Sequence, residues 1–226
     1  MLKYESRQIG KPLKLVIFLH GYNGTIADHQ YALDWLSEKI KNAVVIIPQA
    51  PQISDKNPQK YQWFGMLKYD VDKKRTLPET STEEIFAVYN AAADEIQNCA
   101  NLINNFIDEM QNKFSLGNKE TYIIGFSQGA MLAIYTSLCR IAPVAGVFAL
   151  SGLTAGTVLL DKNIHSHPAL YLFHGEDDMK VQYKTLPYSI RWLEQHNIHP
   201  VVKTYPDLAH KICEDEINKI VQVINK

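Results

Sequence analysis

The sequence predicts an α/β fold, with one mostly parallel β-sheet covered by helices on both faces. Short runs of β-branched and aromatic residues recur along the chain, as they do in buried strands. Segments with helical period lie between these runs, so that strand and helix alternate. Such alternation requires crossover connections and therefore a parallel sheet. The expected strands are residues 13–19, 44–47, 122–126, 144–150, 169–173 and 201–205.

The remaining elements follow in chain order. Residues 2–9 precede a turn signal at Gly10 and Pro12 and are expected to add an antiparallel edge strand. A long helix is expected to start at Ser81, where Glu84 completes a capping box, and to run to about Phe114, whole or broken midway. Apolar side chains at helical spacing predict a last helix, and they are Ile217, Ile220, Val221 and Ile224.

The chain is expected to form one domain over residues 1–226, with no large cap domain. Its 226 residues contain no internal repeat, low-complexity tract or Gly/Ser linker that would separate two domains. The one irregular stretch is residues 51–78, and a connection of that length is usually functional or mobile. We therefore expect this segment to lie on the substrate side of the molecule.

Charge and cysteine content exclude several classes of protein. Lys and Arg number 23 against 24 Asp and Glu, so phosphate-driven binding of nucleic acid is not expected. The three cysteines form no C-x-x-C pair, which argues against a disulfide framework or a zinc knuckle. The apolar stretch at residues 15–19 is too short for a signal core, and no run approaches a transmembrane segment. These features favour a cytoplasmic protein.

A Gly-x-Ser-x-Gly turn marks the candidate nucleophile. Gly125, Ser127 and Gly129 follow a strand and precede an amphipathic helix. A serine hydroxyl becomes an effective nucleophile on such a turn, where a base can reach it and the helix N-terminus faces the developing oxyanion. The alternative is a glycine turn that serves only helix–sheet packing. The context favours Ser127 as the nucleophile.

An acid and a base follow later strands, as partners of this serine should. Asp178 follows the expected strand 169–173, and His210 follows strand 201–205. The order Ser, Asp, His is that of α/β-hydrolases, with His210 as base and Asp178 orienting its ring. His174 and His20 also end strands and are the rivals to His210. The neighbouring acids Glu176 and Asp177 remain alternatives to Asp178.

A glycine-rich loop after the first buried strand supplies candidate oxyanion donors. His20, Gly21 and Tyr22 stand at this strand end, where backbone N–H groups are left to donate. The N–H of Tyr22 and the N–H of Gln128, directly after the nucleophile, could together form an oxyanion hole. The alternative is a plain strand-to-helix turn.

Aromatic and apolar residues crowd into part of the 51–78 segment. One hypothesis is that they form a substrate-binding groove for an acyl chain beside the serine. The alternative is that they pack this segment over the sheet edge, with Phe64 and its Trp neighbour as a structural anchor. The candidate substrate-binding residues are Trp63, Met66, Leu67 and Tyr69.

With these motifs in order, the chain resembles the phospholipase/carboxylesterase family of α/β-hydrolases, which includes acyl-protein thioesterases. The likeness spans nearly the whole chain, from the His-Gly pair at 20–21 to the Tyr-Pro pair at 205–206. The resemblance implies that Asp178 is the triad acid and that Tyr22 donates the first oxyanion N–H. The chain departs from the usual family pattern at Gly65, Met179, Gln182 and Ala209.

The resemblance implies a serine hydrolase of carboxylic esters or thioesters that forms an acyl-enzyme on Ser127. Its partners would be an acyl ester or thioester substrate, such as an acylated protein or a lysophospholipid. No cofactor and no metal are expected, and a homodimer is left open. A serine peptidase is the runner-up, although 226 residues leave no room for the extra domain that usually accompanies that use. The third reading is a non-catalytic acyl-binding module.

Overall fold

A computed structural model describes residues 2–226 as a central sheet of seven strands. The strand order is β1-β3-β2-β6-β7-β8-β9, and a two-stranded hairpin, β4-β5, lies apart from it. β1 runs antiparallel to β3, and the other neighbouring pairs in the large sheet are parallel. The strands are β1 (Tyr4–Gln8), β2 (Lys14–Leu19), β3 (Ala43–Pro48), β4 (Gln52–Ile53), β5 (Tyr61–Gln62), β6 (Thr121–Phe126), β7 (Gly146–Leu150), β8 (Leu170–Gly175) and β9 (Val201–Tyr205).

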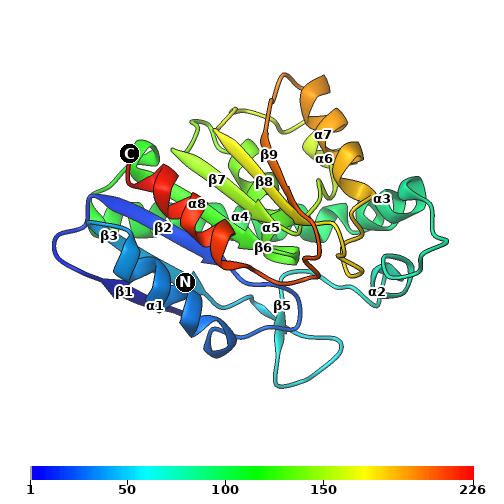
Figure 1. Cartoon of the computed structure of the whole chain (residues 1–226), viewed down its shortest axis with the longest axis horizontal. Helices are drawn as coiled ribbons and strands as arrows, with labels where there is room; N and C mark the ends of the chain where they lie inside the picture. Colours follow the sequence, from blue (N-terminus) through cyan, green and yellow to red (C-terminus); the bar gives the residue numbers. More distant parts are fainter. Residues whose placement is uncertain (1) are drawn as a thin grey trace.

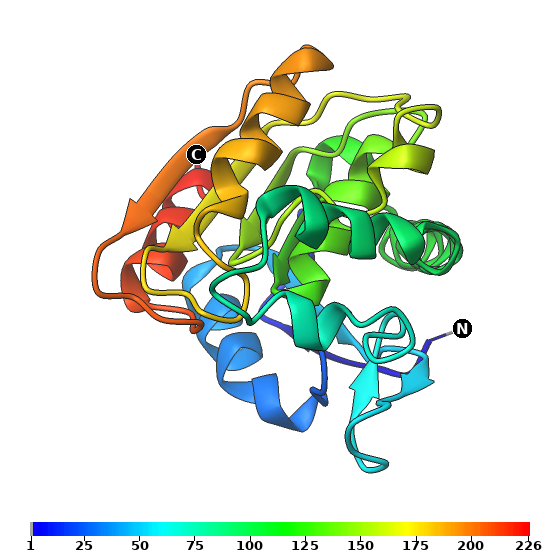
Figure 2. The same cartoon turned by 90° about the vertical axis from the view of Figure 1, so that its right-hand side faces the viewer.

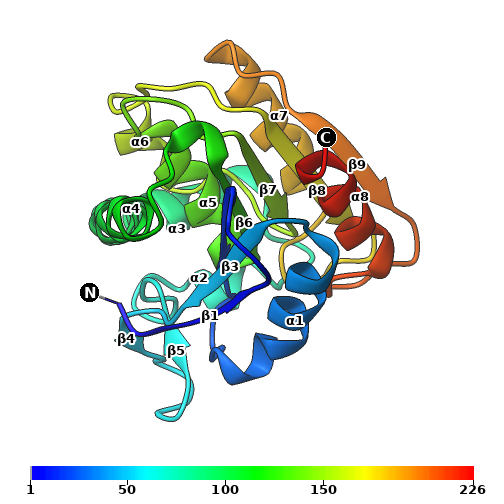
Figure 3. The same cartoon turned by 90° about the vertical axis from the view of Figure 1, so that its left-hand side faces the viewer.

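Helices cover both faces of this sheet, as the alternation of elements predicted. α1 and α8 lie on one face, and α4 and α5 lie on the other, which is clear when the sheet is seen nearly edge-on in Figure 3. Figure 1 shows the strands crossing the molecule between these layers. The helices are α1 (Gln30–Lys39), α2 (Val71–Lys74), α3 (Thr82–Ala91), α4 (Ala93–Phe114), α5 (Gln128–Leu138), α6 (Thr157–Leu160), α7 (Thr185–Gln195) and α8 (Glu214–Ile224).

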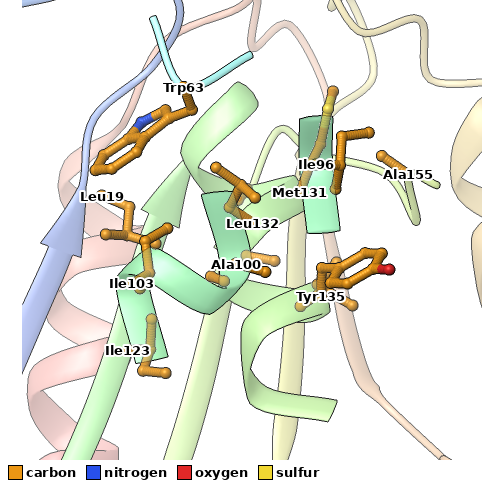
Figure 4. Packing of buried hydrophobic residues seen from close by; sticks show 14 of the residues in the cluster. Leu19, Trp63, Ile96, Ala100, Ile103, Ile123, Met131, Leu132, Tyr135 and Ala155 are labelled. Carbon is orange, nitrogen blue, oxygen red and sulfur yellow. The ribbon is translucent and has the colours of Figure 1, made fainter. Parts of the chain in front are cut away.

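The strand side chains alternate between two hydrophobic clusters, one on each face. In β2, Leu15, Ile17 and Leu19 belong to the cluster under α4 and α5, whereas Val16 and Phe18 belong to the cluster under α1 and α8. All five are fully buried. A strand buried on both faces has no polar positions, which explains why its sequence is a continuous apolar run. The cluster under α4 and α5 is the larger of the two, and Figure 4 shows side chains of both helices packed over Leu19.

The long expected helix is two helices. The Ser81 hydroxyl accepts the Glu84 N–H at 3.2 Å, and the Glu84 carboxylate accepts the Ser81 N–H at 3.0 Å, so the predicted capping box begins α3. The chain leaves helical geometry at Ala92, where ψ is 7°, and resumes as α4 at Ala93. The predicted end at Phe114 is the end of α4.

The segment 51–78 is tied down by short elements rather than free of structure. It contains β4, β5 and α2, and Trp63 and Phe64 are fully buried in the larger cluster. Met66 and Val71 are buried in the same cluster. The segment therefore packs against the sheet layer through its apolar side chains.

One buried carboxyl group, on α8, has a hydrogen-bond partner for only one of its two oxygens among residues 2–226. Glu216 lies in the first turn of α8, and its Oε2 accepts the N–H of Cys213 at 2.7 Å. Its Oε1 has no hydrogen-bond partner among residues 2–226. Burial raises the pKa of Glu216 to about 7, against the opposing effect of the Cys213 N–H. Folding therefore favours the protonated form of this side chain.

The substitution Glu216→Gln is expected to make the free energy of unfolding less dependent on pH. The folded protein keeps this proton up to about pH 7, whereas the unfolded chain releases it near a pKa of about 4.3. The contribution to stability is complete below the unfolded pKa and is lost as pH rises through the folded pKa. Urea unfolding at about pH 5 and about pH 8 should show a smaller loss of stability in Glu216→Gln than in the wild type. Exposed Glu214→Gln is the control, and equal losses in wild type and Glu216→Gln would contradict the expectation.

Across residues 2–226, no helix combines the length and the apolar character that a bilayer span needs.

Candidate active site

The serine of the Gly-x-Ser-x-Gly motif sits on a strained turn between β6 and α5. Ser127 has φ 56° and ψ −119°, a conformation in which non-glycine residues are rare. Its N–H donates to Leu150 O at 2.9 Å, and its carbonyl accepts the first N–H bonds of α5. A Cβ at Gly129 would lie 2.1 Å from Leu19 O, so only glycine lets α5 approach β2 this closely. The close approach brings the nucleophile to the edge of the sheet where β2 ends.

Three side chains from distant parts of the sequence form a continuous hydrogen-bonded row at this edge. His210 Nε2 lies 2.9 Å from Ser127 Oγ, and His210 Nδ1 lies 2.7 Å from Asp178 Oδ2. The serine follows β6, the aspartate follows β8 and the histidine follows β9. The loops after β8 and β9 lie together in the view of Figure 2. The arrangement has the geometry of a nucleophile, a base and an orienting acid.

The loop that carries His210 is braced against the end of β8. Asp177 N–H donates to Leu208 O at 3.2 Å, and a Cβ at Gly175 would lie 2.0 Å from the same oxygen. The ring of His210 also packs on Phe126, with centroids 4.8 Å apart. These contacts hold the imidazole between Asp178 and the serine.

The acid is buried and fully hydrogen-bonded. Asp178 Oδ1 accepts the N–H groups of Lys180 at 2.8 Å and Val181 at 2.9 Å, while Oδ2 faces His210. Burial alone would raise the pKa of Asp178, but His210 and the two N–H groups together hold it below its ordinary value. The carboxylate therefore stays ionised and fixes the proton of His210 on Nδ1.

The rivals to the candidate base and acid make other contacts or are exposed. His174 Nε2 donates to Val181 O at 2.8 Å, and His20 Nε2 accepts the Ala50 N–H at 3.0 Å. Burial lowers the pKa of His174, and it lowers the pKa of His20 to about 4. Both rings are therefore neutral and engaged elsewhere. The acids Glu176 and Asp177 are exposed, whereas the adjacent Asp178 is buried against His210.

The predicted oxyanion donors lie on the two backbone segments that meet at the nucleophile. A Cβ at Gly21 would lie 3.4 Å from Ser127 Cβ, so the loop after β2 packs directly on the serine. Within residues 2–226, neither the N–H of Tyr22 nor that of Gln128 has a hydrogen-bond partner. The Tyr22 hydroxyl donates to Asp55, which anchors this loop from the other side.

Comparison with known proteins identifies the family of this chain. A family model described as phospholipase/carboxylesterase matches residues 6–226. The chain belongs to this family. Acyl-protein thioesterase 1 of Mycosarcoma maydis is 25% identical over 96% of the chain and 92% of its own length. Acyl-protein thioesterase 1 of Saccharomyces cerevisiae is 24% identical, over 93% and 91% of the two chains.

Solved structures agree with the family match. The crystal structure of esterase PE8 superposes with a TM-score of 0.82 and 25% identity, over 98% of this chain and 96% of the other. The α/β-hydrolase fold that the sequence resemblance implied is thereby confirmed. The chain is a hydrolase of esters or thioesters, as the sequence predicted.

Within this phospholipase/carboxylesterase member, the side chain of Gln128 has a structural role that sequence reasoning missed. Its Oε1 accepts the Trp63 N–H at 2.9 Å, and its Nε2 donates to Phe64 O at 2.8 Å. The Trp63 indole N–H donates to His20 O at 2.8 Å. The two aromatic residues therefore connect the nucleophile turn to the loop after β2. The only signal in the sequence was a polar side chain directly before Gly129, at the start of an apolar helix.

A small polar cavity opens beside the serine. Its volume is about 180 Å³, and it is lined by Tyr22, Asn23, Lys56, Arg75, Ser127, Lys180 and His210. None of the four expected groove residues is among these lining residues. Trp63 and Met66 point into the core, the Tyr69 hydroxyl donates to Glu95 at 2.8 Å, and Leu67 is 49% exposed. The structure does not bring these side chains to the cavity, and their role as an acyl-binding wall stays a prediction.

One departure from the family pattern lies beside this cavity. The Gln182 side chain donates to Arg75 O at 2.7 Å and to Leu77 O at 2.9 Å. It therefore fastens the segment after α2 to the loop that carries Asp178. Gly65 is also engaged, since its N–H donates to Glu95 at 3.0 Å.

Proposed function

We propose that this family member cleaves carboxylic esters or thioesters through an acyl-enzyme on Ser127. The observation that carries the proposal is the row from Asp178 through His210 to Ser127, with contacts of 2.7 and 2.9 Å. His210 Nε2 takes the proton of the serine hydroxyl while Oγ attacks the acyl carbon. The same proton then passes to the departing oxygen or sulfur, and the acyl group remains as an ester on Ser127. Water, deprotonated by His210, releases the carboxylic acid in the second half of the reaction.

Charge that develops on the carbonyl oxygen would be stabilised by the backbone. The N–H groups of Tyr22, in the loop that packs on Ser127, and of Gln128, directly after it, have no other partners among residues 2–226. A single oxyanion donor is worth about 2.7 to 4 kcal/mol of the barrier. Asp178, held ionised, stabilises the imidazolium form of His210 during each transfer.

The relatives named acyl-protein thioesterase suggest the substrate class. We propose an acylated protein thioester or a related acyl ester, such as a lysophospholipid, as the natural substrate. Nucleic acid has no place in this proposal. A cytoplasmic location fits the thiols of Cys99, Cys139 and Cys213, which are free.

An acyl-enzyme can be tested by partition between water and a second nucleophile. Acetate esters of phenol and p-nitrophenol and an acetyl thioester would be hydrolysed in the presence of hydroxylamine. If all three form one acetyl-enzyme, the ratio of acetohydroxamate to acetate must be the same for each substrate once the products formed without enzyme are subtracted. A ratio that changes with the leaving group would contradict the covalent intermediate.

Hydrolysis is expected to fall as the solution is acidified. The base must be neutral to accept the serine proton, whereas Asp178 stays ionised because its pKa is lowered. The logarithm of kcat/KM should therefore fall with a slope approaching one per pH unit. The measurement is a pH profile with p-nitrophenyl acetate, with circular dichroism to verify that the protein stays folded. A flat profile down to about pH 5 with folded protein would contradict a histidine base.

A further inference from the structure

The cavity beside Ser127 has a strongly cationic lining. Lys56 comes from the loop after β4, Arg75 follows α2, and Lys180 lies in the loop after β8. None of the residues that line this cavity is an acid. The proposed reaction needs no cation at these positions, because the developing negative charge faces the backbone donors of Tyr22 and Gln128.

Arg75, one of the residues that line the cavity, is buried rather than exposed on the surface. The residue is 7% exposed. Its Nη1 donates to Lys180 O at 2.7 Å, and its Nη2 pairs with Asp72. Its Nε is buried and has no hydrogen-bond partner among the described residues 2–226. The Nη1 and Nη2 contacts therefore hold the guanidinium in its place in the cavity lining.

The neighbouring acids leave a cationic excess in the cavity. Asp72 pairs with Arg75 and, at 3.4 Å, with Lys56. The Asp55 oxygens are occupied by the Tyr22 hydroxyl and by backbone N–H groups of residues 66 and 67. Over residues 2–226, Lys180 has no ion pair. Within the described part of the chain, Lys180 is therefore the cation of this cavity lining that no ion pair neutralises.

The size of the cavity limits what this charge can bind. Its volume of about 180 Å³ is below the range of about 300 to 1,000 Å³ that is usual for drug-sized ligands. Only a short part of a substrate fits next to the serine. A polar cationic wall also gives an uncharged acyl chain little apolar surface to bury.

We propose that the preferred substrate carries an anionic group, a carboxylate or phosphate, a few bonds from the acyl carbon that Ser127 attacks. Lys180, Arg75 and Lys56 bind this group and hold the ester in place for attack. The inference rests on the hydrolase function proposed above and specifies its substrate class. The anionic group belongs either to the acyl part or to the leaving group, and kinetics with matched esters separates the two.

The test uses two pairs of esters that differ by one charge. In the acyl pair, p-nitrophenyl hydrogen adipate is compared with methyl p-nitrophenyl adipate. In the leaving-group pair, p-acetoxybenzoate is compared with methyl p-acetoxybenzoate. Each kcat/KM is divided by the rate constant for hydroxide hydrolysis of the same ester, which removes differences in intrinsic reactivity. We expect the anionic member of one pair to be favoured by about tenfold or more at low salt.

Charge variants identify the side chains responsible. Lys180→Gln should lower the anionic preference severalfold, and Lys180→Glu should abolish or reverse it. Added salt should weaken the preference in the wild type, because the cavity is open to solvent. Lys68→Gln is the matched control. Lys68 lies in the segment 51–78, as Lys56 and Arg75 do, but it pairs with Glu95 at 2.9 Å and does not line the cavity. The preference of Lys68→Gln for the anionic ester over the neutral one should equal that of the wild type.

The outcomes separate this inference from the hydrolase proposal. A preference in either pair that depends on Lys180 supports the inference and assigns the cations to that part of the substrate. Equal or lower normalised rates for both anionic esters would overturn it while leaving the hydrolase intact. If no ester is hydrolysed, calorimetric titration of Ser127→Ala with each ester still decides. Tighter binding of an anionic member supports the cationic site, and no difference within either pair overturns it.

Discussion

The substitution Ser127→Ala is expected to lower kcat/KM for p-nitrophenyl acetate by about 10⁴- to 10⁶-fold, the order of the loss when one triad residue is removed from a serine hydrolase. The reason is that the attacking atom is lost while the backbone turn is kept. Over residues 2–226, the one side-chain hydrogen bond of Ser127 is that to His210 at 2.9 Å. Alanine adopts the same strained turn no less easily, so the folded structure should persist.

The control for this variant is Ser6→Ala, because Ser6 lies on the edge strand β1, far from the nucleophile in the sequence. Both variants should unfold within a few degrees of the wild type, since each loses a single hydroxyl group. Ser6→Ala should retain full turnover. More than a tenth of wild-type activity in a folded Ser127→Ala protein would disprove the nucleophile assignment.

The second large effect is expected from His210→Ala. Its loss of kcat/KM should match that of Ser127→Ala, because the serine hydroxyl is not activated without a base to take its proton. The double variant Ser127→Ala/His210→Ala should be no worse than either single variant, since residues that act as one unit are not additive. The measurement is hydrolysis of p-nitrophenyl acetate at a pH where the wild type is fully active.

His174→Ala provides the matched comparison. His174 is buried beside the same acid, with its Nε2 3.7 Å from Asp178 Oδ2, but it donates to Val181 O and not to the serine. Its removal should reduce stability more than turnover, because it leaves a cavity behind the acid loop. If His174→Ala loses activity as severely as His210→Ala while remaining folded, His210 is not the sole base.

The sequence predicted the parts of the fold that depend on local patterns. Strands such as β2 and β3 are buried on both faces, so they appear as continuous apolar runs. The capping box at Ser81 and the glycines around Ser127 are local as well, because each is a matter of a few residues. The break at Ala92 carries no such signal, since neither glycine nor proline stands there.

The substrate side of the site could not be predicted in the same way. Aromatic and apolar residues in a loop can be buried in the core as readily as against a ligand. Trp63 and Met66 are buried in the core. The cationic wall depends on contacts between segments about a hundred residues apart, such as Arg75 with Lys180. Each of these residues reads as an ordinary surface charge in the sequence.

We propose that Ser127 is the one nucleophile activated by His210 and Asp178. A fluorophosphonate probe tests it most directly, because such reagents form a stable bond with an activated serine and can be located by peptide mass spectrometry. We expect one adduct per chain, on Ser127, with labelling lost in both Ser127→Ala and His210→Ala. An adduct on another residue, or undiminished labelling of Ser127→Ala, would contradict it.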